Sequence, residues 1–220
     1  MCTAACFKDK DCYFGKNLDY EFSYGEQIVV TPRNFEYGFR YTDEPSYKYA
    51  IIGMAHVSDG YPLYYDAMNE KGLGMAGLNF VGNVYFNPVV KNKTNVCSFE
   101  FIPWILCQCE TVEEAIHLIN EMNLCDTPFS ALFPPASLHY MISDSNKTIT
   151  VEVWNKNQSK RIKKDKLKNK FEQFGKNRII EYYGLVNLET SKPDFLRNSI
   201  ADSSVKTCCF IGGLGFLNDS

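Results

Sequence analysis

Short apolar runs separated by turn residues predict a sheet-rich structure over residues 1–155. The runs at 27–31 and 49–54 have the length and composition of strands. A turn at 69–72 leads into an apolar strand of small residues at 73–79. This order predicts a hairpin that places Asn79 at the end of a strand.

Both ends of this region repeat the alternation of apolar segment and turn. At the start, a mixed apolar segment at 2–7 is followed by a charged turn at 8–11 and a second apolar segment. Near the end, residues 139–143 and 148–153 are predicted strands joined by a tight polar turn.

Two helices are predicted between these strands. The segment 99–109 is apolar all round, which predicts a buried helix. Thr111 and Glu114 have the spacing of a capping box, with Thr111 as the N-cap. Apolar residues at helical spacing follow and predict an amphipathic face, which consists of Ala115, Ile116, Leu118, Ile119 and Met122. Strands, helices and strands in this order indicate a layered α+β domain.

The pattern changes after Trp154. Residues 156–170 contain eight basic residues and one acid, Asp165. We favour a solvated helix or linker over a binding patch for this stretch. The glycines at 212–215 do not make a phosphate loop, because no Lys-Ser or Lys-Thr pair follows them.

Length and charge narrow the classes of function. The 220 residues suit one large domain, 1–220, and the formal net charge of -3 gives no general reason to expect nucleic acid or an anionic membrane as partner. No apolar run approaches the roughly 18–20 residues of a membrane helix. The N-terminus lacks the basic and apolar regions of a signal peptide, so we expect a cytoplasmic protein.

The cysteines do not predict a metal site. There are nine, an odd number, and neither Cys107-x-Cys109 nor Cys208-Cys209 makes a C-x-x-C pair. With only three histidines, zinc is not expected. Most of these thiols are expected to be small buried hydrophobic groups.

Cys2 is the first candidate for chemistry. Removal of Met1 would make it N-terminal, and its α-amine could then serve as the base for its own thiol. Such a nucleophile needs a charged neighbour and donors for an oxyanion, and Lys16, Asp19 and Asn79 are the candidates. Each also has an ordinary reading: Lys16 as surface charge, Asp19 as a turn residue and Asn79 as a strand terminator.

Several blocks of sequence, taken together, resemble the choloylglycine hydrolase family, which includes bile salt hydrolases and penicillin V acylases. The blocks cover roughly residues 1–154 in the family's order and spacing. They are Met1-Cys2-Thr3, Phe14-Gly15-Lys16-Asn17-Leu18-Asp19-Tyr20-Glu21, Pro32-Arg33-Asn34-Phe35, Tyr49-Ala50-Ile51-Ile52-Gly53-Met54, Asp66-Ala67-Met68-Asn69-Glu70-Lys71-Gly72-Leu73-Gly74, Ala76-Gly77-Leu78-Asn79-Phe80 and Leu138-His139-Tyr140-Met141-Ile142-Ser143-Asp144.

The resemblance implies an N-terminal nucleophile hydrolase with an αββα four-layer sandwich. It further implies that Cys2 attacks the amide of a glycine- or taurine-conjugated bile salt and forms a thioester. In that reading Asp19 holds the α-amine of Cys2, Lys16 supplies positive charge, and Asn79 contributes to the oxyanion hole. No metal or cofactor is implied.

A steroid pocket is the second implication of the resemblance. Candidate lining residues are Met54, His56, Tyr61 and Phe80, although core packing is the ordinary role of such side chains. Asn79 resembles the bile salt branch, because the penicillin V branch typically carries tyrosine there.

The chain also departs from the family pattern. The family has arginine at the place of Lys16, and lysine lacks the planar fork of arginine. The family's downstream oxyanion asparagine and its arginine after the glycine-rich segment have no counterpart here, so residues 155–220 are expected to be divergent or truncated. The sandwich is then expected to be incomplete at its C-terminal end, with impaired activity.

Four functions follow in order of preference. The first is bile salt amide hydrolysis, and the second is a related acylase for penicillin V or N-acyl homoserine lactones. The third is an inactive homologue that folds in part and associates with full-length homologues through its exposed sheet edge. A homo-oligomer is left open. The fourth, a nucleic-acid binder, rests only on residues 156–170.

Overall fold

The structure is a computed structural model. It describes residues 2–8, 11–18, 23–79, 81 and 84–153, together with the backbone of two later strands, 177–182 and 208–211. The side chains of residues 7 and 8 are not part of that description. Two predicted site residues, Asp19 and Phe80, lie outside the described residues, as do the basic stretch and the glycines at 212–215.

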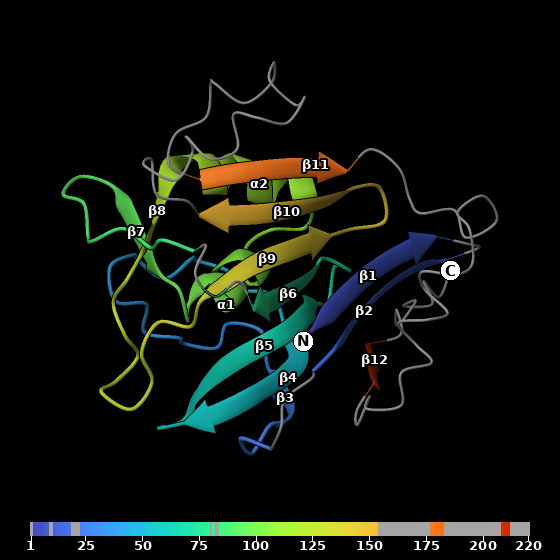
Figure 1. Cartoon of the computed structure of the whole chain (residues 1–220), viewed down its shortest axis with the longest axis horizontal. Helices are drawn as coiled ribbons and strands as arrows, with labels where there is room; N and C mark the ends of the chain where they lie inside the picture. The colour runs from blue at the N-terminus through green and yellow to red at the C-terminus, as the bar shows by residue number, and fades with distance from the viewer. Residues whose placement is uncertain are drawn as a thin grey trace.

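An antiparallel sheet of seven strands forms the centre of the described structure (Figure 1). Its order is β11-β10-β9-β6-β5-β4-β3, so most neighbours along the chain are also neighbours in the sheet. The strands are β3 (Gln27–Thr31), β4 (Ile51–Ser58), β5 (Tyr61–Asn69), β6 (Gly74–Asn79), β9 (Leu138–Ser143), β10 (Thr148–Val153) and β11 (Asn177–Tyr182).

Two smaller sheets accompany it. β1 (Thr3–Lys8) and β2 (Cys12–Asn17) form an antiparallel hairpin, and β12 (Cys208–Ile211) pairs with the other side of β2. β7 (Thr94–Cys97) and β8 (Met122–Cys125) form a short parallel pair.

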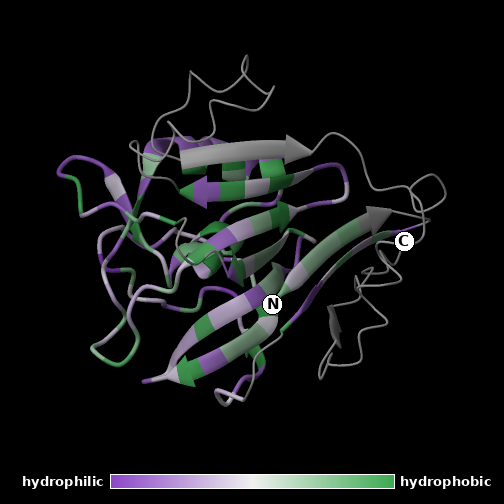
Figure 2. Ribbon diagram, in the orientation of Figure 1, coloured by the Kyte–Doolittle hydropathy of each residue, from purple (hydrophilic) through white to green (hydrophobic). Residues whose placement is uncertain are grey.

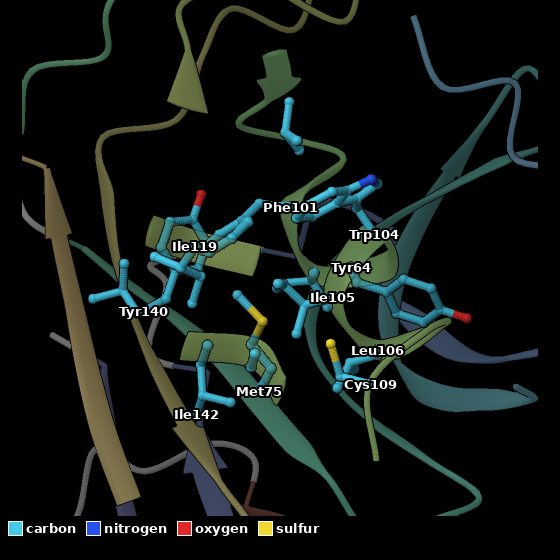
Figure 3. Packing of buried hydrophobic residues seen from close by; sticks show 14 of the residues in the cluster. Tyr64, Met75, Phe101, Trp104, Ile105, Leu106, Cys109, Ile119, Tyr140 and Ile142 are labelled. Carbon is cyan, nitrogen blue, oxygen red and sulfur yellow. The ribbon is translucent and has the colours of Figure 1, made fainter. Parts of the chain in front are cut away.

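Two helices cover one face of the large sheet. α1 (Phe101–Leu106) is buried on all sides, whereas α2 (Val112–Glu121) buries one face. The core lies between these helices and the sheet (Figure 3). There the rings of Phe101 and Tyr140 meet edge to face at 4.8 Å, and the Tyr140 hydroxyl donates to the carbonyl oxygen of Ser98 at 3.1 Å.

The β1–β2 hairpin packs on the opposite face of the large sheet. Side chains alternate along a strand, and the register pairs Ala4 with Lys16 and Cys6 with Phe14. Ala4, Cys6, Cys12, Phe14 and Lys16 therefore share one side, which we call the inner face of the hairpin. A Cβ atom added to Gly74 of β6 would lie 2.9 Å from Cδ1 of Phe14, so the ring rests almost on the backbone of β6.

The described residues thus form three layers, α, β and β. The large sheet has a hydrophobic face toward the helices. Along β10, hydrophobic and hydrophilic residues alternate accordingly (Figure 2). Ile149, Val151 and Val153 of this strand are buried against the helices.

A β-bulge in β5 changes which side chains face the helices. Met54 pairs with Asp66 and Ala55 with Tyr64, so Tyr65 is the extra residue. Tyr64 and Ala67 both belong to the core cluster. Because of the bulge, the consecutive residues Tyr65 and Asp66 both lie on the side of the sheet that faces the hairpin.

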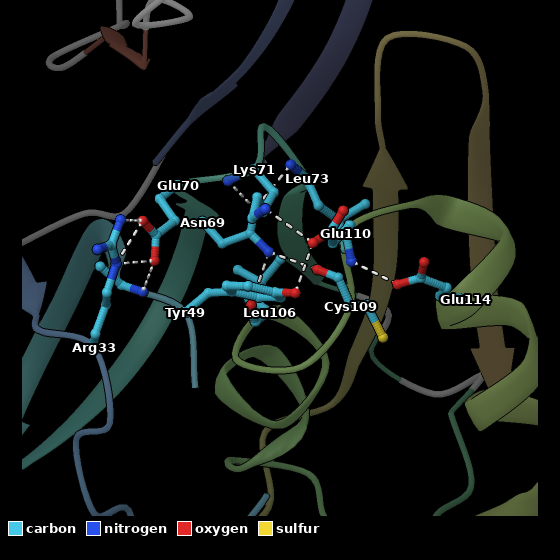
Figure 4. A network of polar contacts seen from close by, with 11 residues as sticks. Arg33, Tyr49, Asn69, Glu70, Lys71, Leu73, Leu106, Cys109, Glu110 and Glu114 are labelled. Atoms are coloured by element: carbon cyan, nitrogen blue, oxygen red, sulfur yellow. Dashed lines mark hydrogen bonds and ion pairs between the residues drawn. The ribbon is translucent and has the colours of Figure 1, made fainter. Parts of the chain in front are cut away.

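The turn between β5 and β6 is fixed to the end of α1 by Asn69 (Figure 4). Its Nδ2 donates to the carbonyl oxygens of Leu106 and Cys109 at 2.8 and 2.7 Å. Its Oδ1 accepts from the backbone N–H groups of Lys71 and Leu73, both at 3.0 Å. The predicted hairpin at 69–79 is confirmed, and the Asn69 side chain ties its turn to the end of α1.

The predicted helices form, with different limits. Thr111 caps α2 by accepting from Glu114 N at 3.2 Å, as the sequence predicts. The helix predicted at 99–109 spans only Phe101–Leu106. Met122 was assigned to the helical face wrongly: it has extended backbone at the end of α2 and begins β8.

Candidate active site

Cys2 lies one residue before β1, with a half-buried thiol that forms no disulfide. The strand start is held by Asn17, whose Oδ1 accepts a hydrogen bond from the backbone N–H of Thr3. Because side chains alternate, Cys2 is directed to the same side as Ala4, the register partner of Lys16. Extending the alternation of β1 by one residue puts Cys2 diagonally across the hairpin from Lys16, on the inner face.

Lys16 is buried, so the reading of it as surface charge is wrong. The residue is only 7% exposed. Its Nζ donates to the carbonyl oxygen of Tyr65 at 3.1 Å and lies 3.6 Å from Oδ2 of Asp66. The same ammonium is 5.8 Å from the centre of the Tyr65 ring. A cation thus stands between the two sheets, next to the strand that begins after Cys2.

Asp66 is the residue of this group that sequence reasoning missed as a site candidate. Burial raises the pKa of its carboxyl, and the nearby Lys16 ammonium opposes that rise. The residue stands in the block Asp66-Ala67-Met68-Asn69, but its direction depends on the bulge at Tyr65, which no sequence pattern marked.

Asn79 is the last residue of β6, where the sequence predicted a strand end. It pairs with Leu138 of β9 and is exposed. Its side-chain amide and the end of the strand are therefore open toward solvent.

The predicted pocket residues fall into two places. Met54 pairs with Asp66 across β4 and β5, which puts it beside the Lys16 ion pair. His56 and Tyr61 contact aromatic residues of the 126–137 loop instead. The His56 ring lies 5.3 Å from that of Phe133, and the Tyr61 ring lies 5.5 Å from that of Phe129.

Two polar atoms in this aromatic region are buried without a hydrogen-bond partner among the described residues. They are the hydroxyl oxygen of Tyr61 and Nδ1 of His56. Burial raises the pKa of the Tyr61 phenol well above its usual value. A neutral hydroxyl in apolar surroundings is suited to a hydrogen bond with a polar group of a bound ligand.

Within the described ranges, no group of three or more His, Cys, Asp and Glu residues is arranged to hold a metal ion. None of the helices there is long and apolar enough to span a membrane.

Comparison with protein families gives one match, to the linear amide C–N hydrolases of the choloylglycine hydrolase family, over residues 2–165. A bile salt hydrolase/transferase of Lactiplantibacillus plantarum is 43% identical over 152 residues, which are 69% of this chain and 47% of the relative. One from Clostridium perfringens is 41% identical, over 69% of this chain and 48% of the relative. The chain spans about half the length of the curated relatives it matches.

Solved structures agree with the family match. A mutant of conjugated bile acid hydrolase from Clostridium perfringens has a TM-score of 0.69 and 32% identity, over 83% of this chain and 51% of that one. Penicillin V acylase from Agrobacterium tumefaciens has a TM-score of 0.55 and 19% identity, over 82% and 49%. The second likeness concerns the fold alone. Together they confirm the predicted α+β fold of the N-terminal nucleophile hydrolases.

Proposed function

Because the chain belongs to the choloylglycine hydrolase family of linear amide C–N hydrolases, we propose that it hydrolyses the amide bond of glycine- or taurine-conjugated bile salts, with Cys2 as nucleophile. The observation that carries the proposal is the position of Cys2 at the start of β1, on the hairpin face that holds the buried Lys16. The names of the relatives, bile salt and conjugated bile acid hydrolases, supply the substrate class.

The reaction begins with a cysteine whose α-amine is free, once whatever precedes Cys2 has been removed. The amine takes the thiol proton, and the sulfur attacks the amide carbon to give a tetrahedral oxyanion. The C–N bond then breaks, and the departing glycine or taurine nitrogen takes the proton from the amine. Water cleaves the resulting thioester, which releases the bile acid and restores the thiol.

Three further residues support these steps in the proposal. Lys16 supplies positive charge that favours the thiolate, because an opposite charge nearby stabilises the ionised form. Asp19 holds the α-amine of Cys2. Asn79, with its exposed amide at the end of β6, donates to the oxyanion.

The steroid is proposed to contact Met54, His56, Tyr61 and Phe80. The buried, unpartnered hydroxyl of Tyr61 and Nδ1 of His56 support this assignment, since both would gain a hydrogen bond from a polar substituent of the ligand. A cytoplasmic location belongs to the same proposal. It is supported by the seven cysteines whose side chains are described, all of which are free thiols.

The test is release of taurine or glycine from a conjugated bile salt by the purified chain, after mass spectrometry has established that Cys2 is N-terminal. Cys2→Ala should abolish release, whereas Cys6→Ala, on the same face of the hairpin, should retain it. Equal release by wild type and Cys2→Ala would refute the mechanism. Release from neither taurine nor glycine conjugates would favour the inactive homologue, and cleavage of penicillin V alone would assign the acylase branch.

A further inference from the structure

We propose that Asp66 is a positioning residue for Cys2: together with the bulged carbonyl of Tyr65, it holds the Lys16 ammonium charged and fixed on the inner face of the hairpin. This inference rests on the role proposed above for Cys2. Asp66 lies on a different sheet from the nucleophile. The bulge in β5 would then serve to direct Tyr65 and Asp66 toward Lys16.

The anchor is built from two kinds of oxygen. The Tyr65 carbonyl accepts one hydrogen bond from Nζ at 3.1 Å, and the Asp66 carboxylate supplies the opposite charge at 3.6 Å. The side chains of Lys16 and Asp66 are 2% and 5% exposed, so water contributes little to either. Both oxygens come from consecutive residues of β5, beside the register shift between β4 and β5.

A buried lysine needs this arrangement more than an arginine would. Guanidinium stays protonated in proteins, whereas a buried ammonium without an opposite charge loses its proton readily. Lys16 is shielded from solvent. Within the described structure, the carboxylate of Asp66 supplies an opposite charge next to its ammonium. Asp66, ionised beside it, therefore helps to keep the lysine a cation.

The link from this pair to Cys2 runs through the hairpin register. Ala4 pairs with Lys16, and Cys2 is two residues before Ala4. Residues related in this diagonal way have their Cβ atoms roughly 7–8 Å apart or somewhat less. The ammonium stands at the end of a four-carbon stem, so its distance from the Cys2 sulfur depends on where Tyr65 and Asp66 hold Nζ.

Other titratable groups near the pair have to be considered in any pH measurement. On β5, burial raises the pKa of the Tyr65 phenol, and Glu26 and Tyr24 raise it further. That phenol is therefore neutral across the range in which a thiol titrates. Asp66 and Lys16 are the pair whose removal tests the positioning role.

The experiment measures the rate of alkylation of Cys2 by iodoacetamide from about pH 6 to about pH 10, the range around the ordinary thiol pKa. Peptide mass spectrometry reports Cys2 separately from the other thiols. Asp66→Asn and Lys16→Met should each slow alkylation of Cys2 at neutral pH by about tenfold, because each removes or releases the cation that favours the thiolate. Asp11→Asn, in the exposed turn of the same hairpin, should leave the profile unchanged.

The double variant decides whether Asp66 acts through Lys16. Asp66→Asn/Lys16→Met should have the same profile as Lys16→Met alone, since there is no longer an ammonium to hold. Additive shifts would overturn the proposal, and so would an unchanged or downward shift in Asp66→Asn. If Asp66→Asn does not fold, a wild-type profile in Lys16→Met overturns it equally.

The positioning role and the proposed function can be refuted independently, because alkylation tests the first and amide hydrolysis tests the second. A chain that shows the expected shifts but cleaves no substrate retains the positioning role and loses the proposed function. A chain that releases taurine through Cys2, with profiles unchanged in the variants, retains the function and loses the positioning role.

Discussion

The sulfur atoms of Cys6 and Cys12 lie 3.9 Å apart on the inner face of the β1–β2 hairpin. A second pair, Cys97 and Cys125, is equally close at 3.8 Å on the neighbouring strands β7 and β8. The two pairs differ in access, because Cys6 and Cys12 are half-buried while Cys97 and Cys125 are fully buried.

We predict that a mild oxidant such as diamide closes the Cys6–Cys12 pair first. Two thiols lose their hydrogens to diamide, which becomes the hydrazine, and one S–S bond forms. The hydrogen bond that Cys125 shares with Cys97 lowers the pKa of the Cys125 thiol to about 7, which favours its reaction. Exposure should decide, since the oxidant has to reach the sulfur. Peptide mapping without reductant provides the measurement, and earlier closure of Cys97–Cys125 would contradict the prediction.

Gly53→Ala should destabilise the protein by roughly 2–3 kcal/mol, as overpacking does in a close contact. A Cβ atom there would lie 2.2 Å from the carbonyl oxygen of Asp66 and 2.5 Å from Cβ of Ala67. Gly15→Ala is the matched control, because nothing lies within 4 Å of its added Cβ. Thermal unfolding compares the two variants, and equal melting temperatures would show that β4 and β5 separate easily.

Asn69→Ala should be destabilising by roughly 3 kcal/mol, because it leaves several buried backbone groups without partners. The side chain donates to two carbonyl oxygens at the end of α1 and accepts from two N–H groups in the β5–β6 turn. Asn146→Ala, in the exposed turn between β9 and β10, should change the free energy of unfolding by less than about 0.5 kcal/mol. Urea unfolding of the three proteins tests this difference.

The stabilising effect of Glu70 should depend on pH. A hydrogen bond from Arg33 lowers the pKa of its carboxyl, and a second one from the backbone N–H of Ala50 adds to this. A folded-state pKa below the unfolded value means that the stabilisation is complete above the unfolded pKa and disappears as pH falls through the folded one.

Glu70→Gln should therefore be less stable than wild type by roughly 1–2 kcal/mol near neutral pH, with the exposed side of the Arg33 pair screened by solvent. The difference should narrow progressively below about pH 5. Urea unfolding at several pH values measures it. A difference that stays constant with pH would mean that the carboxylate charge contributes nothing.

Local patterns predicted much of the fold because they act over short distances. The strands at 27–31 and 148–153 have the predicted limits, and Thr111 caps its helix as expected. The parallel pair β7–β8 was missed, since each strand has only four residues and they are joined through two helices. Strand pairing at such separation leaves no periodic signal in either segment.

The candidate site was predictable where the residue type itself carried the chemistry. Cys2 and Lys16 were selected in that way, and the hairpin register brings them to one face. The burial of Lys16 and the part played by Asp66 were not predictable, because both depend on a single bulged residue, Tyr65. One extra residue in a strand changes the face of the sheet to which the following side chains point. It does so without changing the composition of the segment.

Gly74 shows how a residue outside the Lys16–Asp66 pair can set how deeply the ammonium lies. With only a hydrogen atom where other residues carry a side chain, β6 lets the ring of Phe14 settle against its backbone. Phe14 and Lys16 are two residues apart on one rigid strand, so the same contact fixes how far the ammonium reaches toward Asp66. A methyl group at position 74 would push Phe14, and with it β2, away from the large sheet. The distance between the Lys16 ammonium and the Asp66 carboxylate would increase, although neither charged group is altered.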